Sequence, residues 1–306
     1  MIRYIIRRVL FLVPMLFLIS MLAFALVRVA PGGPFDKNRR PASPEVEKRL
    51  LAKYHLDKPL WRQYLHYLGG ILQGDFGPSL KQRHHSVNDI IAEALPVSLV
   101  LGGLSFSLAM GIGIPLGFYT AIGKGKLFDY TGTFISILFI CVPGLVLGPL
   151  LVMIFAIQLR WFPVGMLGSA WHLVLPVLTL GIYFSGRIAR LMREGMLNVL
   201  YSEFIMTARS KGLSETRLLW KHAFPLAIAP VLSYSGPLLA DLLTGSFVVE
   251  TIFQIPGLGI HLVNSSLSRD YPVIVGLVIL YAFLLMLLNL LVDVIHAWID
   301  PRVQLA

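Results

Sequence analysis

The chain has 306 residues, of which 56% are hydrophobic and 14% are charged, and its formal net charge is +10. This composition excludes an ordinary soluble protein and indicates a polytopic membrane protein. The basic residues cluster beside apolar segments, so membrane topology explains the positive charge better than nucleic acid does. The single cysteine, Cys141, excludes an intramolecular disulfide and a cysteine-based metal cluster, and no metal site is predicted.

The first apolar segment follows three arginines and runs from Val9 to Val27 without a charge. It is long enough to cross a bilayer. It is too long for the core of a signal peptide, and no small-residue cleavage site follows it. Residues 1–30 are therefore predicted to form a cytoplasmic tip and a retained first transmembrane helix.

Residues 31–94 form the one long polar segment, with seven acidic residues and ten Lys or Arg. Helical spacing of apolar residues predicts amphipathic helices at Pro44–Leu56 and at Pro59–Leu72, and Ser86 to Asp89 begins a third. Gly74 to Pro78 is a predicted turn. We expect a small helical cap on the periplasmic face.

Five further apolar segments follow within residues 95–300, and a short tail occupies 301–306. The predicted spans are 95–122, 131–159, 161–186, 225–249 and 271–292. Each is long enough to cross the bilayer when tilt is allowed for. The prediction is an all-α membrane protein with six transmembrane helices and both termini on the same side.

The orientation follows from the charges of the short loops. The pieces expected in the cytoplasm hold thirteen basic residues, whereas the short outer loops hold only Arg160 and Arg269. By the positive-inside rule, both termini and the loop 201–225 are predicted to be cytoplasmic. The thirteen are Arg3, Arg7, Arg8, Lys124, Lys126, Arg187, Arg190, Arg193, Arg209, Lys211, Arg217, Lys221 and Arg302.

Small residues indicate where helices approach closely. Ala109, Gly113 and Gly117 repeat at four-residue steps in one span, and Gly144 and Gly148 do so in the next. Packing inside this chain is favoured over packing against a second subunit.

Asp241 is an ionisable residue near the middle of an apolar span. Such a group costs about 3 kcal/mol unless it faces water or a partner. It either lines a translocation cavity, where it would attract the cationic end of a substrate, or pairs with another helix. The sequence leaves these two alternatives open.

Residues 201–225 form a charged interruption between two apolar spans. Ser202 is a predicted N-cap, Gly212 suits the left-handed conformation that ends a helix, and Ser214 begins a second short helix that runs to Phe224. The expected structure is a short helical knob at the membrane surface. It either serves a soluble partner or is an ordinary interfacial loop.

The stretch after the fifth span contains a Pro-Gly pair that forces a turn, and the residues up to Leu267 can return as a short helix. Its functional interpretation is a lid over an outward opening. The alternative is a well-packed connection. The candidate lid residues are Glu250, Pro256, Gly257 and Gly259.

Two of these stretches resemble permeases of ABC importers in the peptide/nickel family. Residues 207–212 followed by His222-Ala223-Phe224-Pro225 are similar to the family's EAA loop, although the family's glutamate falls on Met206. Residues 249–259 are similar to its V-E-T-I-F-x-x-P-G-L-G segment. Further similarity at 74–79, 269–271 and 300–302 extends the resemblance over nearly the whole chain, in the oligopeptide branch.

The resemblance implies an ABC type I importer permease fold and transport of oligopeptides across the bacterial inner membrane. It implies a homologous second permease subunit, two cytoplasmic ABC ATPase subunits that hold ATP and Mg, and a periplasmic or lipid-anchored peptide-binding protein. This chain would bind no cofactor of its own. The loop residues expected to contact an ATPase are Glu203, Phe204, Thr207, Ala208, Arg209, Lys211 and Gly212.

The residues themselves argue against an enzyme. The stretch Gly117–Lys124 has the wrong spacing for a phosphate-binding P-loop, and Gly125 stands where Ser or Thr is required. A dipeptide or nickel permease is the alternative within the family. An intramembrane enzyme is the alternative from another class, and it would need a buried nucleophile with a base.

Overall fold

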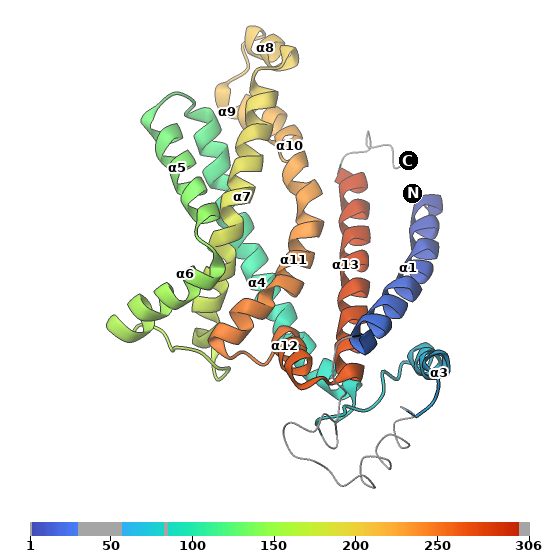
Figure 1. Ribbon diagram of the computed structural model, residues 1–306. Coiled ribbons are helices and arrows are strands. Elements are labelled where there is room, and N and C mark those ends of the chain that lie inside the picture. Colours follow the sequence, from blue (N-terminus) through green and yellow to red (C-terminus); the bar gives the residue numbers. More distant parts are fainter. Residues whose placement is uncertain (1, 30–56, 83–84, 300–306) are drawn as a thin grey trace.

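A computed structural model describes residues 2–29, 57–82 and 85–299, and these residues form helices joined by turns (Figure 1). The only pairing of β type among them is an isolated bridge between Pro78 and Ser86. The all-α prediction is confirmed for this part of the chain. The helix predicted at Pro44–Leu56 lies outside the described residues.

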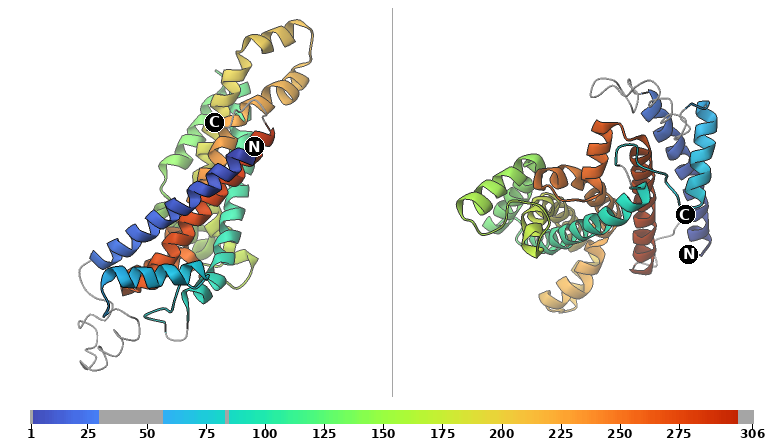
Figure 2. Two further views of the ribbon diagram at one scale, coloured as in Figure 1. Left: turned by 90° about the vertical axis from the view of Figure 1, so that its right-hand side faces the viewer. Right: turned by 90° about the horizontal axis from the view of Figure 1, so that it is seen from below.

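The first and last helices lie side by side. α1 (Ile2–Val29) packs on α13 (Tyr271–Ile299), and the Arg8 guanidinium lies 2.6 Å from the Asp293 carboxylate. α1 begins and α13 ends at the same end of the molecule (Figures 1 and 2), as the prediction of same-side termini requires. Much of α1 exposes large apolar side chains, as expected of a helix that faces lipid.

α3 (Leu60–Leu72) confirms the second predicted amphipathic helix, and it lies at the other end of the molecule. The helix predicted from Ser86 onward is not separate from the second span. α4 (Val87–Ile122) is one helix of 36 residues that continues through Pro96, so residue 94 lies inside it. Ser86 and Asp89 form a reciprocal capping box at its start.

The third predicted span, 131–159, is not one straight helix. α5 (Leu127–Cys141) ends just before Pro143, and α6 (Gly144–Leu151) with the π-helical stretch Val152–Gln158 continues at 99° to it. Pro143 lacks the N–H that would continue α5, and its ring disfavours helical conformation in Val142, which is extended.

The fourth predicted span is displaced along the chain. Residues 161–169 are not helical, and a 3₁₀ turn, Ala170–Leu173, leads into α7 (Val174–Leu200). α7 therefore extends fourteen residues beyond the predicted end at Gly186. The charged residues Arg187, Arg190 and Arg193 belong to this long helix and not to a loop.

The rest of the chain contains the predicted loop helices and the fifth span. α8 (Glu203–Ser210) and α9 (Glu215–Arg217) are followed by a π-helical stretch, Leu218–Ala223, and by α10 (Phe224–Ala227). The second loop helix thus passes through Pro225 and does not end before it. α11 (Ala229–Phe253) and α12 (Leu258–Ser268) complete the order before α13.

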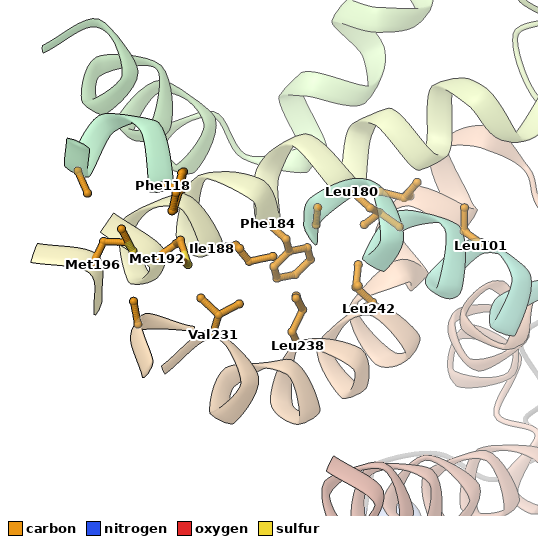
Figure 3. Close-up of a cluster of buried hydrophobic side chains, with 14 of the residues drawn as sticks. Leu101, Phe118, Leu180, Phe184, Ile188, Met192, Met196, Val231, Leu238 and Leu242 are labelled. Atoms are coloured by element: carbon orange, nitrogen blue, oxygen red, sulfur yellow. The ribbon is translucent and has the colours of Figure 1, made fainter. Parts of the chain in front are cut away.

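The main hydrophobic core lies where α4, α7 and α11 meet, and Figure 3 shows its buried side chains. α4 and α7 make the closest contact: a Cβ on Gly113 would lie 2.6 Å from the Ile188 Cβ, and one on Gly117 would lie 2.2 Å from the Ala189 carbonyl oxygen. The predicted small-residue face of the second span therefore packs inside the chain.

The number of spans depends on how the bent helices are counted. Among the described residues, four helices are long and apolar enough to cross a membrane, and up to seven spans result if each bent pair is one span.

Candidate functional site

The loop 201–225 stands beyond the helical bundle, with α8 at the end where α1 begins and α13 ends (Figure 1). In α8, the Ile205 side chain is fully buried while Phe204 and Thr207 are exposed. Gly212 has a φ of +76°, the left-handed conformation predicted for it. The helix therefore has one face held by the protein and one face free for a partner.

An ion pair ties the two helices of this loop together. The Arg209 guanidinium donates two hydrogen bonds to the Glu215 carboxylate, at 2.6 and 3.2 Å, across the Gly212 turn. This carboxylate raises the pKa of Arg209 above its ordinary value. Both side chains are more than half exposed, so the pair sets the geometry of the turn and adds little stability.

Aromatic rings connect the loop to the core. The Trp220 and Phe118 ring centroids are 4.7 Å apart, and Phe224 packs edge-on against Phe118 at 5.8 Å. Phe118 belongs to α4 and is buried. Because these rings are in contact, a displacement of the loop would also displace α4.

A second connection at the same end joins α5 to α7. Arg193 of α7 donates two hydrogen bonds, at 2.9 and 3.1 Å, to the Asp129 carboxylate in the first turn of α5. Asp129 also accepts from the Gly125 N–H at 3.1 Å, which fixes the turn between α4 and α5. The predicted cytoplasmic residue Arg193 thus has a structural role.

At the opposite end, Glu250 is fully buried at the C-terminal end of α11. Its carboxylate accepts from the Gly259 N–H at 2.7 Å, from the Ile260 N–H at 3.2 Å and from the Ser98 hydroxyl of α4 at 2.9 Å. The Ser98 oxygen also accepts from the Leu258 N–H at 2.8 Å. The Glu250 side-chain oxygen thus satisfies backbone N–H groups at the start of α12 that have no partner within that helix.

The two glycines predicted for the lid are required by this network. A Cβ on Gly257 would lie 2.5 Å from the Glu250 carboxyl group, and one on Gly259 would lie 2.4 Å from the Phe247 Cα. Pro256 is exposed on the turn between α11 and α12. The structure therefore brings Glu250, Gly257 and Gly259 together, with Pro256 at the edge.

A second buried carboxylate lies nearby in the chain, between α12 and α13. Asp270 is 2% exposed and accepts hydrogen bonds from the Ser79 hydroxyl, from the Leu80 N–H at 3.0 Å and from the Lys81 N–H at 3.2 Å. It anchors the turn that follows α3. Two motifs that lie about 190 residues apart, 74–79 and 269–271, therefore meet in space.

Between the two ends, α7 and α11 carry exposed polar groups. Arg187 donates hydrogen bonds to the Tyr183 hydroxyl at 3.2 Å and to the Tyr234 hydroxyl of α11 at 3.3 Å. Asp241 is exposed, and its side chain makes no hydrogen bond or ion pair with any residue in the described part of the chain. The pairing with another helix that the sequence left open is therefore not observed there.

The sequence matches two family models that together cover most of the chain. Residues 1–102 match the N-terminal membrane component of binding-protein-dependent transport systems, and residues 113–305 match the inner membrane component of these systems. This chain belongs to that permease family. The permease is accordingly an inner membrane component of a transport system.

Curated relatives align with this permease over their whole length. It is 43% identical to the oligopeptide transport system permease protein OppB of Haemophilus influenzae, over 99% of this chain and 100% of the relative. It is 42% identical to OppB of Escherichia coli over the same shares. It is 41% identical to the dipeptide transport system permease protein DppB of Bacillus subtilis, over 100% of this chain and 99% of the relative.

Solved structures agree on the fold. An inward-facing methionine ABC transporter, MetNI, gives a TM-score of 0.59 at 18% identity, over 69% of this permease and 96% of that chain. An amino acid ABC transporter crystallised with histidines gives 0.53 at 19% identity, over 69% and 94%. The permease therefore has the fold of ABC transporter membrane subunits.

Arg187 was missed as a candidate site residue because the sequence analysis assigned it to a cytoplasmic loop. The structure places it at the centre of α7, thirteen residues from either end of that 27-residue helix. The signal was present: no Pro or Gly pair interrupts the helical pattern between Pro176 and Leu200.

Proposed function

We propose that this permease forms one half of a transmembrane pathway that imports oligopeptides, with the loop 201–225 docked on a cytoplasmic ATPase. A homologous second permease supplies the other half. Two ATPase subunits hold the ATP and Mg, and a binding protein delivers peptides to the α3–α12 end. Full-length similarity to OppB proteins supports the cargo class.

The observation that carries the proposal is the position of α8. It stands clear of the bundle at the end where α1 begins and α13 ends, it exposes Phe204 and Met206, and it is joined to the core through Trp220 and Phe118. An exposed helix with a packed connection to the core helix α4 can transmit force from a partner. An ordinary interfacial loop needs no such connection.

The proposal includes six spans with both termini in the cytoplasm. α1, α4, α7 and α13 are the four long spans. α5 with its bent continuation, and α10 with α11, supply two more. The third bent pair reuses the end of α11 and returns through α12, which fits a re-entrant segment on the periplasmic side better than a seventh crossing.

The mechanism proposed is alternating access. Closure of the ATPases on ATP would move α8, and the connection through Trp220 and Phe118 would pass this movement to α4. At the periplasmic end, the Glu250 network would hold α11, α12 and α4 in one of the two states. Dipeptides are the second candidate cargo, because DppB of Bacillus subtilis is 41% identical over the whole chain. Nickel is the remaining cargo within the family.

Site-directed cross-linking tests the docking of the loop. In a Cys141→Ser background, which removes the only cysteine, Thr207→Cys is expected to cross-link to an ATPase subunit in the assembled complex. Gln254→Cys, which is also exposed but lies at the other end, is the matched control and is expected to form no cross-link to the ATPases. A cross-link from residue 254 but not from 207 would reverse the proposed orientation.

Uptake by the reconstituted complex tests the cargo. Proteoliposomes that hold the permease pair, the ATPases and the binding protein should accumulate labelled tri- to pentapeptides in an ATP-dependent manner. Uptake of dipeptides or nickel alone would select one of the alternatives. Turnover of a substrate by the isolated chain in detergent would instead indicate an enzyme.

A further inference from the structure

The exposed faces of the helices differ in chemistry. α1 and α5 expose many large apolar side chains, as hydrocarbon requires. Among the described side chains, α7 exposes no large apolar group, and α11 exposes only Phe247. The exposed positions of α7 are Arg187, Arg190, Glu194 and Asn198, and those of α11 include Pro230, Ser233, Pro237 and Asp241.

These positions form a continuous polar face. On α11, residues 230, 233, 237 and 241 recur at three- and four-residue steps, so they lie on one side of the helix. Arg187 of α7 reaches the same side, because it donates to the Tyr234 hydroxyl. Charged groups at the centre of a span are not stable against lipid, so this face borders water or protein.

Arg187 and Asp241 are the two charged groups at the centres of their helices. Arg187 is held between two neutral phenols, which leave its positive charge uncompensated within the described residues. Tyr234, its partner on α11, lies seven residues before Asp241, which corresponds to about 10 Å along a helix. The helix position that anchors Arg187 and the position of Asp241 are therefore separated by about the length of three extended residues.

We infer that Arg187 and Asp241 form a two-point site for the charged ends of a peptide, with Arg187 binding the terminal carboxylate and Asp241 the terminal ammonium group. The inference rests on the proposed function, since it requires this face to line the pathway. Tyr183 and Tyr234 position the guanidinium fork, which suits a planar carboxylate. A zwitterionic chain leaves neither charge on this face unpaired, whereas a chain with a blocked end leaves one.

The test compares peptides with free and blocked ends in proteoliposomes containing the whole complex. Transport is measured as the initial rate with the binding protein saturated, so that selection by the binding protein does not enter. A tripeptide is compared with its N-acetyl and its C-amide forms. The variants are Asp241→Asn and Arg187→Gln, and Arg190→Gln is the matched control because its cation already pairs with Glu194 at 3.1 Å.

The expected result is that each variant slows only those peptides that carry the charged end bound by the substituted residue. Asp241→Asn should slow the free tripeptide about ten-fold and the N-acetyl form less than two-fold, since one charge-assisted hydrogen bond is lost only where the ammonium is present. Arg187→Gln should slow the free tripeptide about ten-fold and the C-amide form less than two-fold, because only the free form has the carboxylate that Arg187 would bind. Arg190→Gln should leave all three rates within about two-fold, as expected for a surface pair.

Two outcomes would overturn the inference. If each variant slowed all three peptides equally, the charges would hold the second permease or the fold, and co-purification of the subunits would fall in parallel. If neither variant changed any rate, the face would not touch cargo. Absence of ATP-dependent uptake by the unmodified complex would instead refute the proposed function itself.

Discussion

Removal of the buried Glu250 carboxylate is the most direct perturbation of the end of the molecule where α11 meets α12. Glu250→Ala deletes an acceptor of three hydrogen bonds, two from the start of α12 and one from Ser98. Each hydrogen bond to a charged acceptor contributes about 1.5 kcal/mol, and the abandoned N–H groups stay buried. The expected loss of stability is therefore about 4–5 kcal/mol.

This loss can be measured by thermal unfolding of the purified permease in detergent, followed by tryptophan fluorescence. For a chain of this size, about 2 °C of Tm corresponds to 1 kcal/mol, so Glu250→Ala should lower Tm by about 8–10 °C. Ser98→Ala removes two of the hydrogen bonds and should lower Tm by about 4 °C. Glu194→Ala, an exposed carboxylate, should change Tm by less than about 1 °C.

The reasoning is refuted if Glu250→Ala unfolds within about 2 °C of the unmodified permease, because the carboxylate would then not hold α12 to α11 and α4. An equal loss in Glu250→Ala and Glu194→Ala would also count against it, since only the buried carboxylate has backbone donors. Glu250→Gln should fall between, because one amide oxygen remains as an acceptor.

Three further perturbations test other parts of the structure. Gly212→Pro should leave membrane insertion intact but abolish peptide-stimulated ATPase activity of the complex, because proline cannot adopt the φ of +76° at the loop turn. Asp129→Asn weakens the connection between α5 and α7 and should lower Tm by about 3 °C, with unchanged Tm as the contrary result. Gly117→Leu should abolish the monodisperse peak in size-exclusion chromatography, because a Cβ at position 117 would lie 2.2 Å from the Ala189 carbonyl oxygen. Gly103→Leu is the control and should keep the peak, because a Cβ at position 103 would have no heavy atom within 4 Å.

Local signals predicted the elements that local physics controls. Apolar runs located α1, α4, α11 and α13, and Ser86 with Asp89 located the start of α4. Gly212 marked the end of a loop helix because its left-handed conformation is a property of the residue itself. The small residues at 113 and 117 predicted a close helix contact inside the chain, because a missing side chain lets two backbones approach; that the partner is α7 was not predicted.

Features that depend on distant partners escaped prediction. Proline inside a membrane span is compatible with a mild kink or a complete break, so the sequence alone did not distinguish the 99° bend at Pro143 from a kink. The pairing of Glu250 with Ser98 joins residues 152 positions apart, and no periodic pattern encodes it. The end of the fourth span was predicted too early because the charge of Arg187 was taken to end the helix, which instead continues to Leu200.

α11 joins the two ends of the molecule physically. Its start follows α10 and the loop 201–225 that holds α8, and its last turn contains Glu250. One helix of 25 residues therefore links this loop to the hydrogen bonds of the buried carboxylate. A rigid helix would move both ends together. Pro237, however, lies inside α11 between Tyr234 and Asp241 and removes a backbone hydrogen bond there. Bending of α11 is therefore easiest beside Arg187 and Asp241, where a conformational change that begins at α8 would alter the spacing of the two charges.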